Sequence, residues 1–412
     1  MAGHGERMSI EFQPGARAWL RAAMFVGLGQ QVFVVLRNQY LLDLGVAPES
    51  VAVVQGAGGA AGIAAGLVGL WALRRFRART LLVAGVVANA AGFAIQVSAT
   101  SAASMVLGAA VAGLGIQGLT MTSAPFLAAQ SSPRERVRLF VAHTLLIQTV
   151  PGVVGALLAG GVHRVAGDAL GSPLGGYRVA LGVGAVALLV GLVPILRLSA
   201  DDDPAPTGTR ALWRLRQPLR AAALLAPDVL VFFGNGLVVP FLQIYFKRRF
   251  GLAPSAIGGL YAVLMLVGSA GHLLSPGLSR RFGTWPVILG TQLLSLPLFA
   301  ELLFAGAVPL AATAFVLRQA VMNMSAPLYA SFLHTSVTPE DSGPVASYRM
   351  LAQSVAWAGA SFLAGPLLVA DGGDFRYVLA ATMVAYVLAI VTGALVFPRA
   401  SRWRAPSPME VA

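Results

Sequence analysis

Residues 45–77 of the chain read GVAPESVAVVQGAGGAAGIAAGLVGLWALRRFR, and residues 251–283 read GLAPSAIGGLYAVLMLVGSAGHLLSPGLSRRFG in the same frame. Matches of Ala, Gly and Leu are expected by chance in a chain this rich in them. The return of Ala47-Pro48 as Ala253-Pro254 is not expected by chance. The pattern indicates a tandem duplication in which each half is one complete structural unit.

Three more motifs repeat with nearly the same spacing. They are Arg74-Arg75-Phe76 with Arg280-Arg281-Phe282, Gln117 and Ser123-Ala124-Pro125 with Gln319 and Ser325-Ala326-Pro327, and Gln148 and Leu158-Ala159-Gly160 with Gln353 and Leu363-Ala364-Gly365. Because each second copy follows its first by 202 to 206 residues, we expect two halves of one architecture with small loop differences. Within the first copy, Gly58, Gly62 and Gly66 share one helix face and predict close packing against a neighbouring helix.

The composition is that of a membrane protein. Only 11% of the residues are charged, whereas 57% are hydrophobic, and a soluble domain carries roughly a quarter charged residues. Apolar segments of about 20 residues, long enough to cross a hydrocarbon core of roughly 30 Å as helices, recur along nearly the whole chain. We therefore predict an all-α polytopic membrane protein. The absence of Cys excludes disulfides, thiol catalysis and Cys-ligated metals.

The hydropathy pattern predicts twelve transmembrane helices, six in each half. The expected spans are residues 19–42, 51–73, 80–98, 103–128, 138–160, 177–198, 221–246, 256–275, 285–305, 309–332, 345–368 and 376–397. We divide the chain into an N-terminal half (1–198), a cytoplasmic linker (199–220) and a C-terminal half (221–412). The basic end of the linker, Arg210–Arg220, fits either a helix on the membrane surface or a solvated loop.

The basic residues are distributed unevenly between the two sides of the membrane. If both termini lie on one side, that side holds 21 of the 29 Lys and Arg residues and the other holds 6, while Arg37 and Arg318 lie inside spans. Basic loops stay in the cytoplasm, so we expect cytoplasmic termini and a multi-pass protein of the plasma membrane. The net charge of +13 belongs to loops, and nucleic acid is not an expected partner.

The loop after the second span carries a further pattern, GLWALRRFRAR at residues 69–79. Two six-helix halves, a cytoplasmic central loop and this Arg-rich loop resemble the major facilitator superfamily over the whole chain. In that family the loop reads Gly-x-x-x-Asp-Arg-x-Gly-Arg-Arg. Here Leu73 replaces the acid and Phe76 replaces the second Gly, while the second copy keeps Gly283 and has Arg280 at the acidic position. The resemblance implies a cytoplasmic gate, with gating residues Gly69, Arg74, Arg75, Arg280, Arg281 and Gly283.

The resemblance also implies two parallel six-helix bundles related by a pseudo-twofold axis, with a midplane site lined by the first, fourth, seventh and tenth helices. The polar candidates for substrate binding in those spans are Gln30, Gln31, Arg37, Asn38, Gln117, Asn235, Gln243, Arg318, Gln319 and Asn323. Gln30 and Arg37 are seven residues apart and share a helix face. The duplicated Gln117 and Gln319 are expected to face one another, either as ligand contacts or as partners in interhelical hydrogen bonds.

Two arginines inside the spans need an explanation. Arg318 lies about nine residues, roughly 14 Å, into the tenth span. A charge at that depth faces a cavity or a partner, and we weigh a ligand contact against an ion pair with Glu301 near the outer end of the ninth span. Arg37 lies nearer the outer boundary, where its side chain either reaches the interface or lines the site.

The spans contain no carboxylate near their middle. Asp43, Glu49 and Asp228 fall at or beyond helix ends by this assignment, and Glu301 lies close to one. The pattern therefore disfavours a carboxylate proton relay. There is also no metal-ligand cluster, phosphate-binding loop or catalytic acid–base pair, so we expect no enzyme, no metal and no cofactor.

We predict a secondary transporter that moves a small organic solute by rocking its two halves, as a monomer with membrane lipid and a coupling ion as further partners. The two arginines inside spans and Lys247-Arg248-Arg249 at the outer mouth favour an anionic or amphipathic solute. Pro151–Gly155 is similar to part of the helix-five signature of antiporters, which favours efflux. Two alternatives stay open. One is a lipid flippase-like protein with an apolar lateral opening between the halves, and the other is a non-transporting sensor that binds a partner through residues 198–220.

Overall fold

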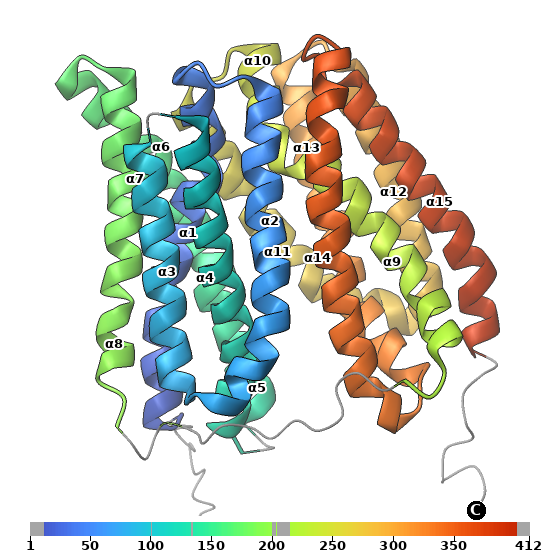
Figure 1. The fold of residues 1–412 in the computed structure, drawn as a ribbon. Coiled ribbons are helices and arrows are strands. Elements are labelled where there is room, and N and C mark those ends of the chain that lie inside the picture. The colour runs from blue at the N-terminus through green and yellow to red at the C-terminus, as the bar shows by residue number, and fades with distance from the viewer. Residues whose placement is uncertain (1–11, 100, 133–134, 200–202, 204–214, 402–412) are drawn as a thin grey trace, which may run out of the picture.

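A computed structural model describes residues 12–99, 101–132, 135–199, 203 and 215–401. These residues form helices and no strands (Figure 1). The first half contains α1 (Pro14–Asp43), α2 (Pro48–Arg75), α3 (Ala78–Ser98), α4 (Ala102–Ala129), α5 (Arg136–Thr144), the π-helix η1 (Leu145–Thr149), α6 (Val150–Leu170), α7 (Pro173–Val190) and α8 (Leu192–Leu196). The second half contains α9 (Pro218–Val238), the 3-10 helix η2 (Val239–Phe241), α10 (Leu242–Phe250), α11 (Pro254–Phe282), α12 (Thr284–Phe304), α13 (Val308–Thr335), α14 (Pro339–Ala370) and α15 (Arg376–Ser401).

The helix ends follow local sequence rules. Proline occupies the first turn of α1, α2, α7 and α11, where its missing N–H removes no intrahelical hydrogen bond. Ser101 and Ser104 form a capping box at the start of α4. Gly171 and Gly251 end α6 and α10 with φ values of +57° and +65°, a conformation that glycine adopts without steric cost.

The predicted all-α membrane fold is confirmed. Eleven helical segments of the described residues are long and apolar enough to cross a membrane. Among them, α5, η1 and α6 act as one span, as do α9, η2 and α10. The twelfth helix, α13, has 28 residues but is less apolar because it carries Arg318, Gln319 and Asn323.

The duplication is visible in matching contacts. Tyr40 donates a hydrogen bond to the Val97 carbonyl (3.0 Å) in the first half, and Tyr245 donates to the Leu302 carbonyl (2.6 Å) in the second. Each bond joins residues 57 positions apart. The two tyrosines are the same position of the repeat, so the repeated sequence gives repeated tertiary structure.

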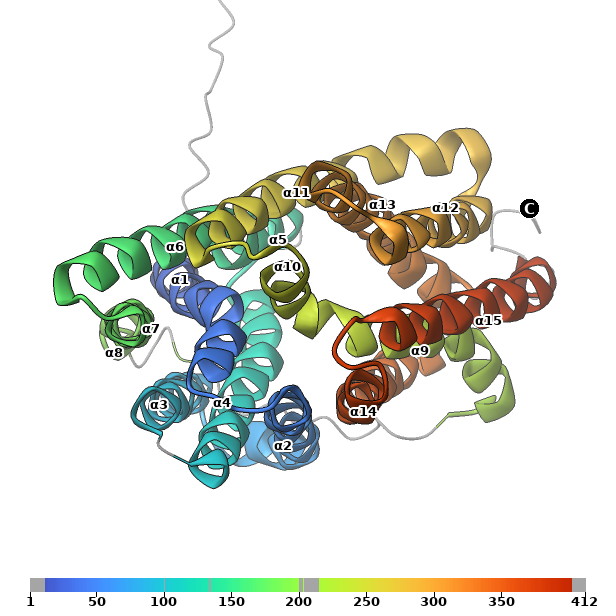
Figure 2. The same ribbon diagram turned by 90° about the horizontal axis from the view of Figure 1, so that it is seen from above.

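The two halves meet along two seams. The first six spans form one bundle and the last six form the other; α2 packs beside α14 on one side of the molecule, and α6 packs beside α11 on the other (Figure 2). α1 begins and α15 ends at the same end of the molecule, which we call the terminal end (Figure 1). The opposite end, where α1 meets α2, is the distal end.

The structure corrects the placement of two charged residues and one boundary. Arg349, one of the 21 basic residues counted on the cytoplasmic side, lies within α14, and Asp228, assigned to a helix end, lies ten residues after Pro218 within α9. Hydropathy places these ends too late because the first turns of both helices contain polar residues. α9 therefore begins inside the predicted linker 199–220, most of which lies outside the described residues. Of the basic segment 210–220, expected as a surface helix or a solvated loop, residues 210–214 lie outside the described part and Pro218 begins α9.

Candidate functional site

The distal end is closed by contacts between α1 and the second half. Asn38 donates from Nδ2 to the Pro240 carbonyl (2.5 Å), and Gln243 donates from Nε2 to the Val34 carbonyl (2.8 Å). Both amide side chains are buried, at 1% and 3% exposure. Asn38 and Gln243, predicted as substrate contacts, therefore join the two halves in this conformation.

An ion pair lies beyond these contacts, at the distal end of α1. Lys247 Nζ on α10 is 2.6 Å from Asp43 Oδ2 at the end of α1, and it also donates to the Tyr177 hydroxyl (3.2 Å) on α7. Lys247 belongs to the basic cluster that was expected to attract anions at the outer mouth. Its charge is instead paired with a carboxylate of the other half, so the Asp43–Lys247 pair acts as a distal latch.

We expect removal of this latch to favour opening of the distal end. The two side chains are 21% and 33% exposed, so the pair contributes about 1 kcal/mol, and Asp43→Asn should shift the closed-to-open equilibrium about fivefold. Because the chain has no native Cys, pairs of spin labels on engineered cysteines across the distal end report this shift directly. An unchanged distance distribution in both Asp43→Asn and Lys247→Met would show that the pair does not hold the halves together.

The α2–α14 seam is tightly packed near the distal end. A Cβ at Gly56 would lie 2.7 Å from the Phe362 ring, and one at Gly59 would lie 2.9 Å from Ala358 Cβ. The α6–α11 seam is also close, because Gly160 lies against Ser255. The halves thus touch along the distal part of the α2–α14 seam. On the α6–α11 side the contacts continue to the middle of α11, where Ser269 donates to the Thr149 hydroxyl (3.1 Å).

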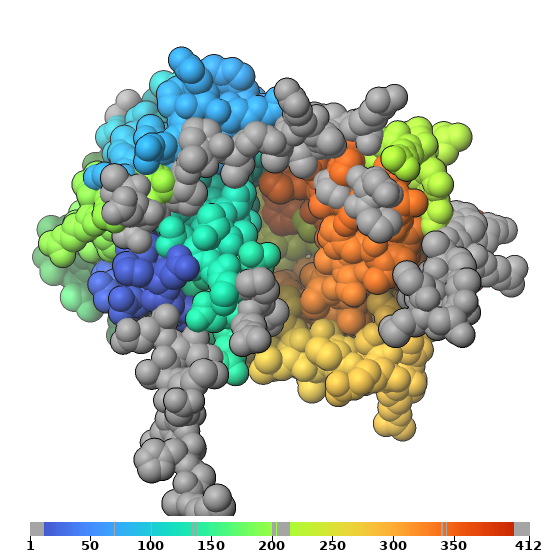
Figure 3. All heavy atoms as spheres, turned by 90° about the horizontal axis from the view of Figure 1, so that it is seen from below, coloured from blue at the N-terminus to red at the C-terminus, as the bar shows by residue number. Residues whose placement is uncertain are grey.

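A cavity of about 500 Å³ lies between the halves. Figure 3 looks onto the terminal end and shows a depression between α4 and α14. The cavity is lined by Gln30, Val34, Arg37, Gln55, Gly58, Gly59, Gly62, Asn89, Phe93, Ala109, Ala112, Gly113, Ile116, Gln117, Phe232, Met350, Gln353, Ser354 and Trp357. Three of the predicted site residues, Gln30, Arg37 and Gln117, therefore lie in the cavity.

Arg37 is the one charged residue among those that line the cavity in the described structure. Its Nη2 donates to Gln55 Oε1, and Gln55 Nε2 donates to Asn38 Oδ1 (3.4 Å). No described carboxylate forms an ion pair with Arg37. A guanidinium paired only with an amide oxygen retains the charge and the donors that a carboxylate, sulfonate or phosphate would bind.

Two amides that line the same cavity as Arg37 have unused hydrogen-bonding capacity. Asn89 is 1% exposed, and neither its Nδ2 nor its Oδ1 has a partner among the described residues. Gln30 Nε2 is also without one. Buried polar groups in proteins are nearly always hydrogen-bonded, so an unpaired Asn in a cavity wall indicates a group that bonds to a ligand or to water.

Arg318 lies inside the second half and not in the cavity wall. Its Nη2 donates to Asn235 Oδ1 and to the Tyr386 hydroxyl (2.5 Å), and its Nη1 donates to Gln319 Oε1 (3.4 Å). The guanidinium also lies 4.9 Å from the centre of the Phe299 ring. The weighed ion pair with Glu301 does not form. Arg318 instead joins α9, α12, α13 and α15, as a cation held by amides and rings.

The remaining predicted substrate contacts divide between the two halves. Asn235 and Gln319 bind Arg318, and Asn323 accepts from Gln319 Nε2 (3.0 Å). Gln31 lies against Gly155 of α6 and outside the cavity. Gln117 and Gln319 hold matching places in the repeat, since each lies beside a glycine of the second helix of its half, Gly62 or Gly268.

A buried ion pair in the second half was missed from the sequence. Asp228 is 5% exposed, and Arg349 binds both of its oxygens, with Nε–Oδ2 at 2.9 Å and Nη2–Oδ1 at 3.2 Å. Gln353 donates to the same carboxylate (2.5 Å) and also lines the cavity. The repeat of Gln148 as Gln353 drew attention to Gln353, but nothing in the sequence connected Gln353 to Asp228 or Arg349.

The sequence profile of the Major Facilitator Superfamily matches residues 20–361. The chain belongs to the Major Facilitator Superfamily. A comparison with curated proteins gives no match in sequence.

Solved transporter structures share the fold of this superfamily member. A bacterial homologue of the human lysosomal transporter Spinster, inward-facing and unoccupied, has a TM-score of 0.77 at 16% identity and covers 95% of this chain and 98% of its own. A D-xylose–proton symporter gives 0.70 at 16% identity, with 95% and 98% covered. A bacterial homologue of the iron transporter ferroportin, inward-facing, gives 0.72 at 18% identity, with 93% and 98% covered.

The two loops that carry the predicted gating residues lie at the terminal end. Arg75, Arg280 and Arg281 are exposed at the ends of α2 and α11 and form no ion pair within the described part of the chain. Arg74 is likewise exposed. Gly69 faces Met121 inside the first half, and Gly283 ends α11 with a φ of +87°. Figure 3 shows a depression between the halves at this end, and the gating role of these six residues stays a prediction.

Proposed function

We propose that this member of the superfamily is a secondary transporter for small organic anions, which it binds in the central cavity through Arg37. The observation that carries the proposal is the charge of the cavity wall, in which Arg37 is the one charged residue among the described lining residues. Asn89 and Gln30 also have amide N–H groups without partners, which can donate hydrogen bonds to the oxygen atoms of such a solute.

Alternating access supplies the transport step. The halves are in contact at the distal end through the Asp43–Lys247 latch, and Figure 3 shows a depression between them at the terminal end, which supports one end state of such a cycle. The excess of basic residues at the terminal end supports a cytoplasmic location of both termini in a plasma membrane. The similarity of Pro151–Gly155 to an antiporter signature supports efflux, and a cavity built by one chain supports a monomer.

Exchange measurements test the proposal without knowledge of the coupling ion. Proteoliposomes loaded with unlabelled benzenesulfonate, whose charge is fixed, are expected to take up labelled benzenesulfonate faster than protein-free liposomes. An absence of exchange for benzenesulfonate and for butanesulfonate would contradict the proposal and favour the sensor hypothesis, which predicts no flux. Exchange of phospholipid between leaflets, without exchange of these anions, would favour the flippase-like hypothesis.

Arg318→Gln is expected to lower stability while leaving anion selectivity intact. The substitution removes the charge that is bound by Asn235, Tyr386 and Gln319, so the melting temperature in detergent should fall. The ratio of benzenesulfonate to benzenesulfonamide affinity should match that of the wild type, because Arg318 lies outside the cavity wall. A tenfold loss of that ratio in Arg318→Gln would show instead that Arg318 contacts the solute.

A further inference from the structure

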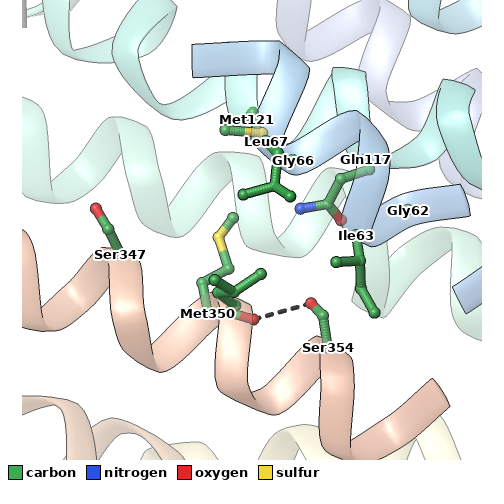
Figure 4. Close-up of a pocket in the computed structure, with 10 residues that line it drawn as sticks. Gly62, Ile63, Gly66, Leu67, Gln117, Met121, Ser347, Met350 and Ser354 are labelled. Carbon is green, nitrogen blue, oxygen red and sulfur yellow. Dashed lines mark hydrogen bonds between the residues drawn. The ribbon is translucent and has the colours of Figure 1, made fainter. Parts of the chain in front are cut away.

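The α2–α14 seam opens toward the terminal end into a second, smaller cavity. Beyond the contact of Gly59 with Ala358, the two helices separate and enclose about 80 Å³ (Figure 4). We call this space the seam pocket. It is lined by Gly62, Ile63, Gly66, Leu67, Gln117, Met121, Ser347, Met350, Leu351 and Ser354.

The seam pocket is continuous with the central cavity. Gly62, Gln117, Met350 and Ser354 line both. In Figure 4 the Met350 side chain extends from α14 toward α2, between the two helices. A molecule held at Arg37 can therefore extend one end into the seam pocket without a rearrangement of the backbone.

The two connected spaces differ in chemistry. The seam pocket has no charged residue in its described lining, and Ile63, Leu67, Met121, Met350 and Leu351 supply most of its surface. Methionine side chains adapt to apolar groups of varied shape. The central cavity instead offers the guanidinium of Arg37 and the unpaired, buried amide of Asn89.

We propose that the seam pocket binds the apolar chain of an amphipathic organic anion whose charged group is bound at Arg37. This inference rests on the proposed function and narrows its substrate class to anions with an alkyl or similar apolar chain. The continuity of the two spaces, the apolar lining of one and the single charge of the other support this occupant. A chain that fills the pocket gains apolar burial with each methylene, which corresponds to about fourfold in affinity per CH₂.

Gly66 offers a way to fill the seam pocket without a backbone clash. A Cβ at Gly66 would approach only Gln117 Nε2 (3.8 Å) and Met121 Sδ (4.0 Å), so Ala fits there in ordinary van der Waals contact, and the longer side chain of Leu is expected to occupy part of the pocket. The predicted packing role of the glycine face thus holds for Gly58, which lies against α4, and not for Gly66. Gly182 in α7, whose Cβ would meet nothing within 4 Å, is the matched control position.

The test measures how alkanesulfonates of increasing length, from butane- to decanesulfonate, inhibit the exchange of labelled butanesulfonate in proteoliposomes. Wild type and Gly182→Leu are expected to bind longer chains more tightly, by about fourfold per CH₂ until the pocket is full. Gly66→Leu should retain butanesulfonate exchange and lose most of this increase, with Gly66→Ala in between. Partition of the long chains into the bilayer is the same for every variant, so the comparison between variants isolates the pocket.

Several outcomes would overturn the seam-pocket assignment alone. In the first, the affinity of Gly66→Leu rises with chain length as much as that of Gly182→Leu. In the second, both Gly66 variants lose the same factor in affinity at every chain length. In the third, the wild type exchanges butanesulfonate but binds all chain lengths with equal affinity. Failure of the wild type to exchange any anion would instead contradict the proposed function. The two failures are therefore distinguishable in one set of experiments.

Discussion

Asp228→Ala is expected to lower the free energy of unfolding by about 3–5 kcal/mol, because it leaves the Arg349 guanidinium buried without a counter-charge. The carboxylate is 5% exposed, is bound by Arg349 through two hydrogen bonds and accepts a third from Gln353. The pair joins α9 to α14 inside the second half. Reversible denaturation in mixed micelles measures the change.

The double variant Asp228→Ala/Arg349→Leu is the control for this prediction. Removing both charges also removes the penalty of an unpaired ion, so the double variant should be more stable than Asp228→Ala alone. Additive losses in the two single variants and the double variant would mean that the two side chains do not interact in the folded protein. Asp43→Ala at the partly exposed distal latch should cost far less than Asp228→Ala, because water solvates the remaining Lys247.

Arg37→Gln is expected to reduce the rate of organic anion exchange by about ten- to a hundredfold at low substrate concentration. A hydrogen bond between charged groups contributes about 1.5–3 kcal/mol, and Gln keeps the polarity of the site without its charge. Binding of the neutral benzenesulfonamide should change little. Exchange of labelled benzenesulfonate gives the transport rate, and thermal-shift titration gives the affinities for both ligands.

Arg37→Lys and Arg318→Gln serve as controls for this variant. Lys retains the charge but not the planar pair of donors, so exchange should fall between that of wild type and that of Arg37→Gln. Arg318→Gln should keep the preference for the anion over the neutral ligand. If Arg37→Gln exchanges benzenesulfonate at the wild-type rate, Arg37 has no part in solute binding and the proposed function loses its main support.

Much of the fold follows from local signals in the sequence. The Ala47-Pro48 and Ala253-Pro254 copies begin α2 and α11, and the hydropathy pattern locates the transmembrane helices to within a few residues at most ends. The repeat and the basic loop also pointed to the superfamily, and the profile match to residues 20–361 shows that the chain belongs to it. Errors arose where a polar first turn extends a helix beyond its apolar part, as at Pro218 of α9.

The site was harder to predict because it depends on which helices meet. The resemblance pointed to the first, fourth, seventh and tenth helices, whereas α2, α3 and α14 contribute Gln55, Asn89 and Gln353 to the cavity wall. Arg318 was singled out for its depth in a span, yet depth does not distinguish a cavity wall from the interior of one bundle. Arg37, nearer a helix end, lies in the cavity wall. The contact of Asn38 with Pro240 holds that end of α1 against the second half, at the distal side of the cavity.

Protection of a single cysteine tests the central claim, that an organic anion binds beside Arg37, most directly. The chain has no native Cys, and Ser354→Cys places one thiol of nearly the same shape in the cavity wall. Benzenesulfonate is expected to slow the reaction of this thiol with a maleimide in detergent at concentrations at which the weaker-binding benzenesulfonamide does not. This protection should disappear in Ser354→Cys/Arg37→Gln. Equal protection by benzenesulfonate with and without Arg37 would contradict the account.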